Sequence, residues 1–109
     1  MPHTDPSLSE FQSVIDATFG EKDRRRGVAG TFMWFTEEVG ELARALKRGD
    51  HDRENLVTEF GDVLAWLNTL ASMSGVDMRE AAARYTAGCP RCHRIPCACE
   101  ERTRFVQQS

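Results

Sequence analysis

The sequence predicts an all-α fold: an antiparallel helical hairpin with two shorter helices, and a four-helix-bundle core completed by dimerisation. Three observations indicate it. Between Thr4 and Tyr85 apolar residues recur at spacings of three and four, which is the period of an amphipathic helix. No segment alternates apolar and polar residues as a strand does. All four prolines, at positions 2, 6, 90 and 96, lie near the chain ends, so the middle lacks the strongest helix breaker.

A charged segment separates the first two predicted helices. The first covers residues 7–19, and Gly20 is expected to stop it. The segment EKDRRRG, residues 21–27, is expected to form a solvated loop or a frayed helix start. The second helix covers residues 28–48, and Gly49 can close it in a left-handed cap. Its continuous apolar stripe consists of Val28, Phe32, Phe35, Val39, Leu42 and Leu46.

The third predicted helix starts near Asp50 or Asp52, either of which can cap it, and ends around Met73. A short fourth helix, MREAAARY, is capped by Asp77 and stops near Gly88. The third helix also carries an apolar stripe, formed by Leu56, Phe60, Val63, Leu67 and Leu70.

Two long helices joined by a short turn must lie antiparallel. The two shorter helices leave much of the apolar surface of this pair uncovered, so we expect a second copy of the chain to complete the core. The predicted organisation is a helical domain at residues 1–88, followed by a cysteine-rich tail at residues 89–109.

The composition excludes several classes of protein. The 109 residues allow one domain, and a net charge of −3 does not suggest a binder of nucleic acid polymers. No apolar run approaches the ~20 residues of a membrane span, so no membrane partner is expected. The N-terminal MPHTDPSLSE has no basic start followed by an apolar stretch, so it does not read as a secretory signal. We therefore expect a cytoplasmic location.

Two pairs of acidic residues lie beside the apolar stripes of the long helices. Glu38 and Glu41 are three residues apart on one helix, and Glu59 and Asp62 are three apart on the next. Each pair lies about nine residues from the turn, so at ~1.5 Å rise per residue the pairs reach similar heights in an antiparallel hairpin. Four carboxylates are therefore expected to converge on one spot.

Carboxylates gathered in this way need compensating positive charge. Oxygen ligands with no histidine or cysteine nearby favour Mg²⁺ or Mn²⁺ over zinc, and Mg²⁺ commonly also binds substrate phosphates. An ordinary solvated acidic face is the alternative interpretation. A di-iron site is set aside, because it requires Glu-x-x-His pairs and neither acidic pair contains a histidine.

The two acidic motifs resemble a known family. EEVGE followed by EFGD is similar to the MazG-like members of the all-α NTP pyrophosphatase superfamily, whose signature is Glu-x-x-Glu, a spacer, then Glu-x-x-Asp. The surrounding EEVGELARAL and EFGDVLAWLNTLA also resemble that family, and the resemblance covers roughly residues 8 to 86. The signature is present without departure, with a spacer of seventeen residues, in Glu38, Glu41, Glu59 and Asp62.

The resemblance implies a Mg²⁺-dependent hydrolase that cuts a nucleoside triphosphate between the α- and β-phosphates and releases the monophosphate and pyrophosphate. It also implies a homodimer or a dimer of dimers. Glu37 and Glu38 are the candidate catalytic residues, with Glu37 orienting or deprotonating the attacking water. A solvent-exposed role for Glu37 stays open. The metal ligands that the resemblance implies are Glu38, Glu41, Glu59 and Asp62.

Four further residues are candidates for substrate binding. Trp34 lies one turn before Glu38, and Trp66 lies one turn after Asp62, so either ring can stack on a nucleobase. The alternative is that both rings belong to the core or to a dimer interface. Asn68, which is expected on the helix surface, is a candidate for contact with the base or sugar. Lys47 is a candidate for contact with the phosphates.

The tail CPRCHRIPCACE contains all four cysteines, in the pattern Cys-x2-Cys-x4-Cys-x-Cys. Four thiolates can close a tetrahedral zinc site, which would be structural because it leaves no open position. His93 can replace one sulfur, and free or redox-active thiols are the alternative. The predicted zinc ligands are Cys89, Cys92, Cys97 and Cys99.

A second hypothesis for the whole chain is a non-catalytic module. In that case the helical dimer and its zinc knuckle would recognise a nucleotide or a protein without turnover. The intact acidic quartet favours the enzyme, because a pure binding module does not need it.

Overall fold

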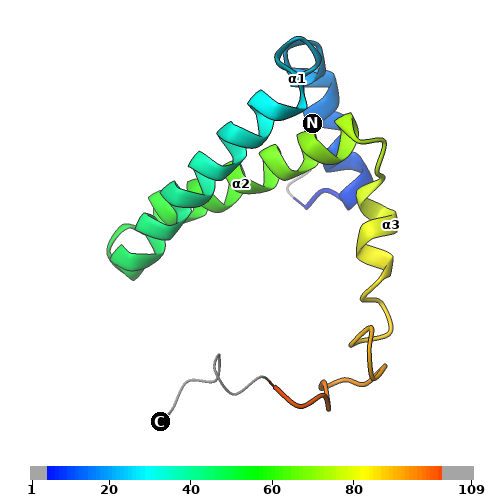
Figure 1. The fold of residues 1–109 in the computed structure, drawn as a ribbon. Helices are drawn as coiled ribbons and strands as arrows, with labels where there is room; N and C mark the ends of the chain where they lie inside the picture. The colour runs from blue at the N-terminus through cyan, green and yellow to red at the C-terminus, as the bar shows by residue number, and fades with distance from the viewer. Residues whose placement is uncertain (1–4, 102–109) are drawn as a thin grey trace. The chain divides into compact units, whose positions relative to one another are not determined.

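A computed structural model describes residues 5–101 of the chain. The elements are α1 (Leu8–Arg48), the 3-10 turn η1 (Gly49–Asp52), α2 (Arg53–Met73) and α3 (Met78–Ala83). Helices α1 and α2 pack together as a hairpin, which confirms the all-α class and the helical hairpin (Figure 1).

The described residues form two compact units that divide between Arg79 and Glu80. The predicted division into residues 1–88 and 89–109 stays a prediction. Its last part, residues 102–109, lies outside the described residues.

The main correction concerns the start of the hairpin. The charged segment predicted as a loop or frayed start is helical, and Gly20 does not stop the helix, which continues to Gly27. Gly27 takes φ 85° and ψ 167°, so α1 consists of two helical parts that meet at a bend. Figure 1 shows this change of direction between the blue and cyan parts of α1. The predicted helix stop at Gly20 is wrong, because Gly20 is buried within the helix. The helix is instead interrupted at Gly27, which takes a positive φ that other residues rarely adopt.

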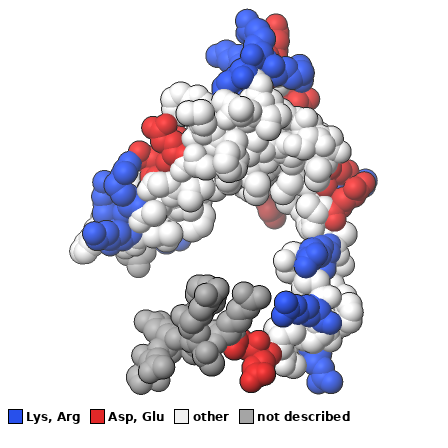
Figure 2. All heavy atoms as spheres, in the orientation of Figure 1, with Lys and Arg blue, Asp and Glu red and all other residues white. Residues whose placement is uncertain are grey.

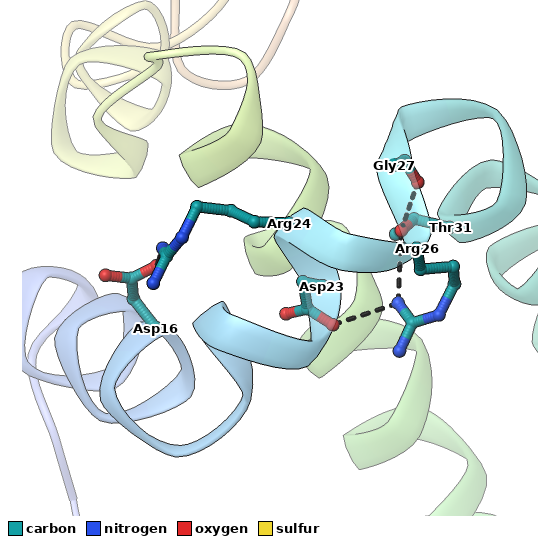
Figure 3. A network of polar contacts seen from close by, with 6 residues as sticks. All are labelled: Asp16, Asp23, Arg24, Arg26, Gly27 and Thr31. Atoms are coloured by element: carbon teal, nitrogen blue, oxygen red, sulfur yellow. Dashed lines mark hydrogen bonds and ion pairs between the residues drawn. The ribbon is translucent and has the colours of Figure 1, made fainter.

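Side-chain hydrogen bonds span the bend in α1 (Figure 3). Arg26 Nη1 donates to Asp23 Oδ1 at 2.9 Å and to Thr31 Oγ1 at 3.1 Å. The Thr31 hydroxyl donates in turn to the carbonyl of Gly27 at 2.8 Å. Asp23 and Thr31 are both buried, at 3% and 0% exposure, so this network is shielded from water. The bend is therefore fixed by specific contacts on both of its sides.

Local capping explains where the helices begin and end. Ser7 and Glu10 form a reciprocal capping box at the start of α1, and the hydrogen bonds from Ser7 lower the pKa of Glu10. Gly49 ends α1, as the sequence predicts, but its φ of 69° and ψ of −144° are not those of the predicted left-handed cap. Of the two predicted caps for α2, Asp52 is the one used, since its side chain accepts from the backbone N–H of Asn55 at 3.1 Å.

Helix α3 is shorter than predicted and ends at Ala83, before Gly88. Beyond it, the backbone N–H groups of Arg84 and Tyr85 donate to carbonyls three residues back, at 3.4 and 3.0 Å, which tightens the chain into turns.

Gln12 ties the first part of α1 to the chain that leaves α2. Its amide nitrogen donates to Ser72 Oγ at 3.1 Å and to the carbonyl of Val76 at 2.8 Å. Its amide oxygen accepts from the backbone N–H of Met78 at 2.9 Å. This one side chain fixes the position of the loop between α2 and α3.

The core is small for the amount of apolar surface. Among the described residues, the buried apolar side chains are Ile15, Ala45 and Ala71. Much of the predicted stripe is exposed: Phe32 at 53% and Phe60 at 51%, for example. The expectation that the hairpin leaves apolar surface uncovered is thus confirmed, while association with a second copy stays a prediction. Within residues 5–101, no helix is both long enough and apolar enough to cross a membrane.

Candidate metal centre

Three of the predicted acidic ligands meet between the two helices of the hairpin. Glu38 comes from α1, and Glu59 and Asp62 come from one face of α2. One carboxylate oxygen from each lies within 4.8 Å of the other two. Figure 2 shows acidic side chains gathered over the paired helices, between basic groups at the hairpin turn and at the bend of α1. The antiparallel packing thus brings Glu38 together with residues that lie twenty-one and twenty-four positions further along the sequence.

The electrostatics of this acidic cluster (Glu38, Glu59 and Asp62) call for a cation. Glu38 and Glu59 are half-buried, and Glu59 Oε2 is buried without a hydrogen-bond partner. The pKa of Glu38 is raised, first by burial and then by the negative charges of Asp62 and Glu59. Oxygen donors at this spacing, one of them lacking any partner, fit a hard divalent cation such as Mg²⁺.

Glu41, the fourth predicted ligand, is not part of the acidic cluster. Its carboxylate forms an ion pair with Arg44, one turn further along α1. The predicted quartet is therefore a trio in this structure, because a neighbouring guanidinium holds the fourth carboxylate. Glu37 is exposed and likewise lies outside the cluster. The catalytic and ligand roles of Glu37 and Glu41 stay predictions.

The two tryptophans stack on each other across the hairpin. The ring centroids of Trp34 and Trp66 lie 6.3 Å apart, with 10° between the planes. The guanidinium carbon of Arg26 lies 5.0 Å from the centroid of the Trp66 ring, a cation–π contact. Trp34 is 49% exposed, so its ring remains accessible to a ligand. Through these contacts, the stacked tryptophans connect Arg26, at the bend of α1, with the part of α2 that carries Asp62.

The remaining two substrate-binding candidates lie in different surroundings. Asn68 is 1% exposed, so the expectation that it lies on the helix surface is wrong. Its amide nitrogen donates to the carbonyl of Leu64 at 2.8 Å, and its buried Oδ1 has no partner. Lys47 is exposed in the last turn of α1, roughly 13 Å along the helix from Glu38 at ~1.5 Å per residue. Substrate contact stays a prediction for both, and for Asn68 it requires the side chain to become accessible.

A pocket beside the acidic cluster was missed by the sequence analysis. It has a volume of about 390 Å³, and its lining includes Asp62, Trp66, Lys22 and Arg26. The two cations lie in the segment that was predicted to be a solvated loop or a frayed helix start. A helical interpretation would have put Lys22 and Arg26, four residues apart, on one face. That spacing is the signal that could have found them.

The four cysteines form a second group of possible ligands, in the unit that begins at Glu80. Their sulfur atoms all lie within 4.8 Å of one another, and none is in a disulfide. Backbone N–H groups of Cys92 and Arg91 lower the pKa of Cys89 to about 6. Hydrogen bonds with the other thiols, Cys97 first, raise that of Cys99 to about 12. His93, the predicted alternative ligand, is exposed and is not in the group.

Comparison with known families identifies the domain to which most of the chain is similar. The model of the MazG nucleotide pyrophosphohydrolase domain matches residues 27–94, which is well over half of the chain. The matched region contains the whole acidic cluster. Among curated proteins, none matches the chain significantly.

Proposed function

Because the chain belongs to the MazG nucleotide pyrophosphohydrolase domain family, we propose that it hydrolyses a nucleoside triphosphate between the α- and β-phosphates. The products are the nucleoside monophosphate and pyrophosphate. The observation that carries this proposal is the meeting of Glu38, Glu59 and Asp62 between α1 and α2. A site short of positive charge is suited to an ion that also binds phosphates.

The acidic cluster is proposed to hold Mg²⁺, with Mn²⁺ as a substitute. A divalent cation bound there supplies charge neutralisation for the triphosphate and polarises the phosphorus under attack. Glu38, Glu59 and Asp62 provide the oxygen ligands, and Glu41 joins them only if it leaves Arg44. The partnerless Glu59 Oε2 supports this assignment, because a cation satisfies an oxygen that the protein leaves unpaired.

The attacking water is proposed to be oriented by Glu37, with Glu38 as the second catalytic carboxylate. Glu37 is exposed on α1 and directly precedes Glu38. Neighbouring residues on a helix do not share a face, so this role requires the Glu37 side chain to reach around the helix toward a water at the cluster. The water oxygen attacks the α-phosphorus, the bond from that phosphorus to the bridging oxygen breaks, and pyrophosphate leaves. The carboxylate takes the proton that the water loses.

The pocket next to Asp62 is proposed to receive the nucleotide. Lys22 and Arg26 provide positive charge for phosphate oxygens. Trp66, which lines the pocket, and Trp34, which is 49% exposed, are proposed to contact the base. Lys47 is a further proposed phosphate contact at the end of the hairpin.

The exposed apolar stripe supports a homodimer or a dimer of dimers. A hairpin with three buried apolar residues in its described part has little core of its own. A second hairpin packed on the stripe would bury side chains such as Phe32 and Phe60.

The test is a pyrophosphate assay with Mg²⁺ on the eight common NTPs and dNTPs. We expect pyrophosphate and monophosphate in equal amounts from at least one of them. Glu59→Gln removes a proposed ligand and should abolish the reaction, whereas the matched change Glu21→Gln, on an exposed glutamate outside the cluster, should leave it intact. Release of orthophosphate would move the cut to another bond. Binding of a nucleotide without turnover would favour the non-catalytic module.

A further inference from the structure

The unit that contains the cysteines has no hydrophobic core of its own. Between residues 80 and 101, no side chain is buried. Chains below about 40 residues usually need a disulfide, a metal or a partner to hold one conformation. The cysteines are free thiols, so no disulfide provides that restraint.

The sulfur atoms have the separations of a tetrahedral metal site. The Sγ atoms of Cys89 and Cys99 lie 3.7 Å apart, and those of Cys92 and Cys97 lie 4.0 Å apart. Four sulfurs about 2.3 Å from a central zinc ion would be roughly 3.8 Å from one another. A disulfide would require about 2 Å. The arrangement therefore leaves room for an ion between the sulfurs.

Backbone N–H groups point at three of the four sulfurs. Arg91 donates to Cys89 Sγ at 3.4 Å, and Ala98 donates to Cys92 Sγ at 3.4 Å. The N–H of Cys99 donates to the sulfur of Cys97 at 3.3 Å. Such donors stabilise negative charge on sulfur and orient it, which is what a thiolate ligand needs.

The loop around the sulfurs is closed by its backbone. The N–H of His93 donates to the carbonyl of Cys89 at 2.7 Å, and the N–H of Cys89 donates to that of Arg94 at 3.2 Å. Gly88 allows this closure, because a Cβ there would lie 2.8 Å from the Arg94 carbonyl oxygen and 2.5 Å from the Ile95 side chain. The loop thus already has the closed form that wraps a metal.

We propose that Cys89, Cys92, Cys97 and Cys99 bind one Zn²⁺ in a closed structural site. Four sulfur ligands leave no position for water or substrate, so this zinc takes no part in hydrolysis. Soft thiolates select zinc, whereas the carboxylates of the acidic cluster select a hard ion, so the two sites hold different metals. Zinc binding releases the thiol protons and changes no oxidation state.

The test measures metal content of the full chain, purified under reducing conditions without chelator. Elemental mass spectrometry should find one zinc ion per chain. Substitution of the zinc by Co²⁺ should give the visible absorption spectrum of a tetrahedral thiolate site. Cys92→Ser and Cys99→Ser should each abolish stoichiometric zinc. His93→Asn is the matched control, because asparagine tolerates the φ of 59° at this position and should keep the metal.

Several results would overturn the proposal. The first is a wild-type chain that contains no zinc and gives no cobalt spectrum. The second is a chain whose cysteines are joined as disulfides. The third is a loss of zinc in His93→Asn as large as that in the serine variants. None of these readouts depends on hydrolysis, so a failure here leaves the proposed enzymatic activity untouched.

Discussion

Replacing Glu38 by glutamine should stabilise the metal-free protein and remove its response to Mg²⁺. Glu38 lies within 4.8 Å of the carboxylates of Glu59 and Asp62. Two unit charges at that distance repel by about 1 kcal/mol in water and by roughly 3 to 4 kcal/mol at an effective dielectric of 20. Because Asp62 is exposed and screened by solvent, we take the lower end, about 1 to 2 kcal/mol in total.

The raised pKa of Glu38 explains why Glu38→Gln should increase the stability of the metal-free protein. The folded state holds this proton more tightly than the unfolded state, so the contribution to stability is favourable at low pH and is lost as pH rises through the folded pKa. At neutral pH the charged carboxylate therefore opposes folding. Glutamine removes that charge with nearly the same shape, and its amide can donate to Glu59.

The assay is thermal unfolding followed by circular dichroism. In EDTA, Glu38→Gln should melt about 4–8 °C above the wild type for each kcal/mol gained. Added Mg²⁺ at about 100 times its Kd should stabilise the wild type by about 2.7 kcal/mol and leave the variant unchanged. Glu21→Gln, the exposed control, should follow the wild type in both buffers. A lower melting temperature for Glu38→Gln in EDTA, or an equal response to Mg²⁺, would refute the reasoning.

Three further changes test the fold. Arg26→Ala removes the ion-pair partner of Asp23, whose side chain is only 4% exposed. Urea titration should show a free energy of unfolding about 3 kcal/mol lower than in the wild type. A loss below about 0.5 kcal/mol would contradict the role of the bend network. Gln12→Ala removes three hydrogen bonds at about 1 kcal/mol each. The backbone amides of the loop after α2 should then exchange their hydrogens faster than in the wild type. Unchanged exchange rates would contradict the role assigned to Gln12. Ser7→Ala removes the N-cap and should destabilise by about 1 kcal/mol at neutral pH. The pKa of Glu10 is lowered from 4.5, first by the backbone N–H of Ser7 and then by its side chain, so the contribution of Glu10 to stability is present above that value and is lost as pH falls through the folded pKa. The variant keeps the backbone N–H and loses only the side-chain hydrogen bond, so its melting should depend on pH slightly less steeply there; a steeper dependence than in the wild type would disprove this.

The hairpin could be predicted because its signals are local. The three–four spacing of apolar residues defines both long helices, and Gly49 ends the first where the pattern stops. The bend could not be located, because glycine identity alone does not tell a helix stop from a close contact. Gly20 is buried inside α1, while Gly27 breaks it, and what distinguishes them is the network that Asp23 and Arg26 form around the bend.

The acidic cluster was predictable to the extent that it depends on helix geometry. Residues three apart share a face, so the pairing of Glu59 with Asp62 and their approach to Glu38 follow from an antiparallel hairpin. The choice of side-chain partners does not follow from spacing. Glu41 has the right position but pairs with Arg44, and Asn68 is buried although its residue type favours a surface.

The most direct test of the central claim is a crystal of the full chain grown with Mn²⁺ and examined by anomalous diffraction. We predict a peak about 2 Å from carboxylate oxygens of Glu38, Glu59 and Asp62, and its disappearance in Glu59→Gln crystals grown in the same way. A wild-type crystal with these three side chains ordered and no ion among them, or with the peak at other residues, would contradict the account.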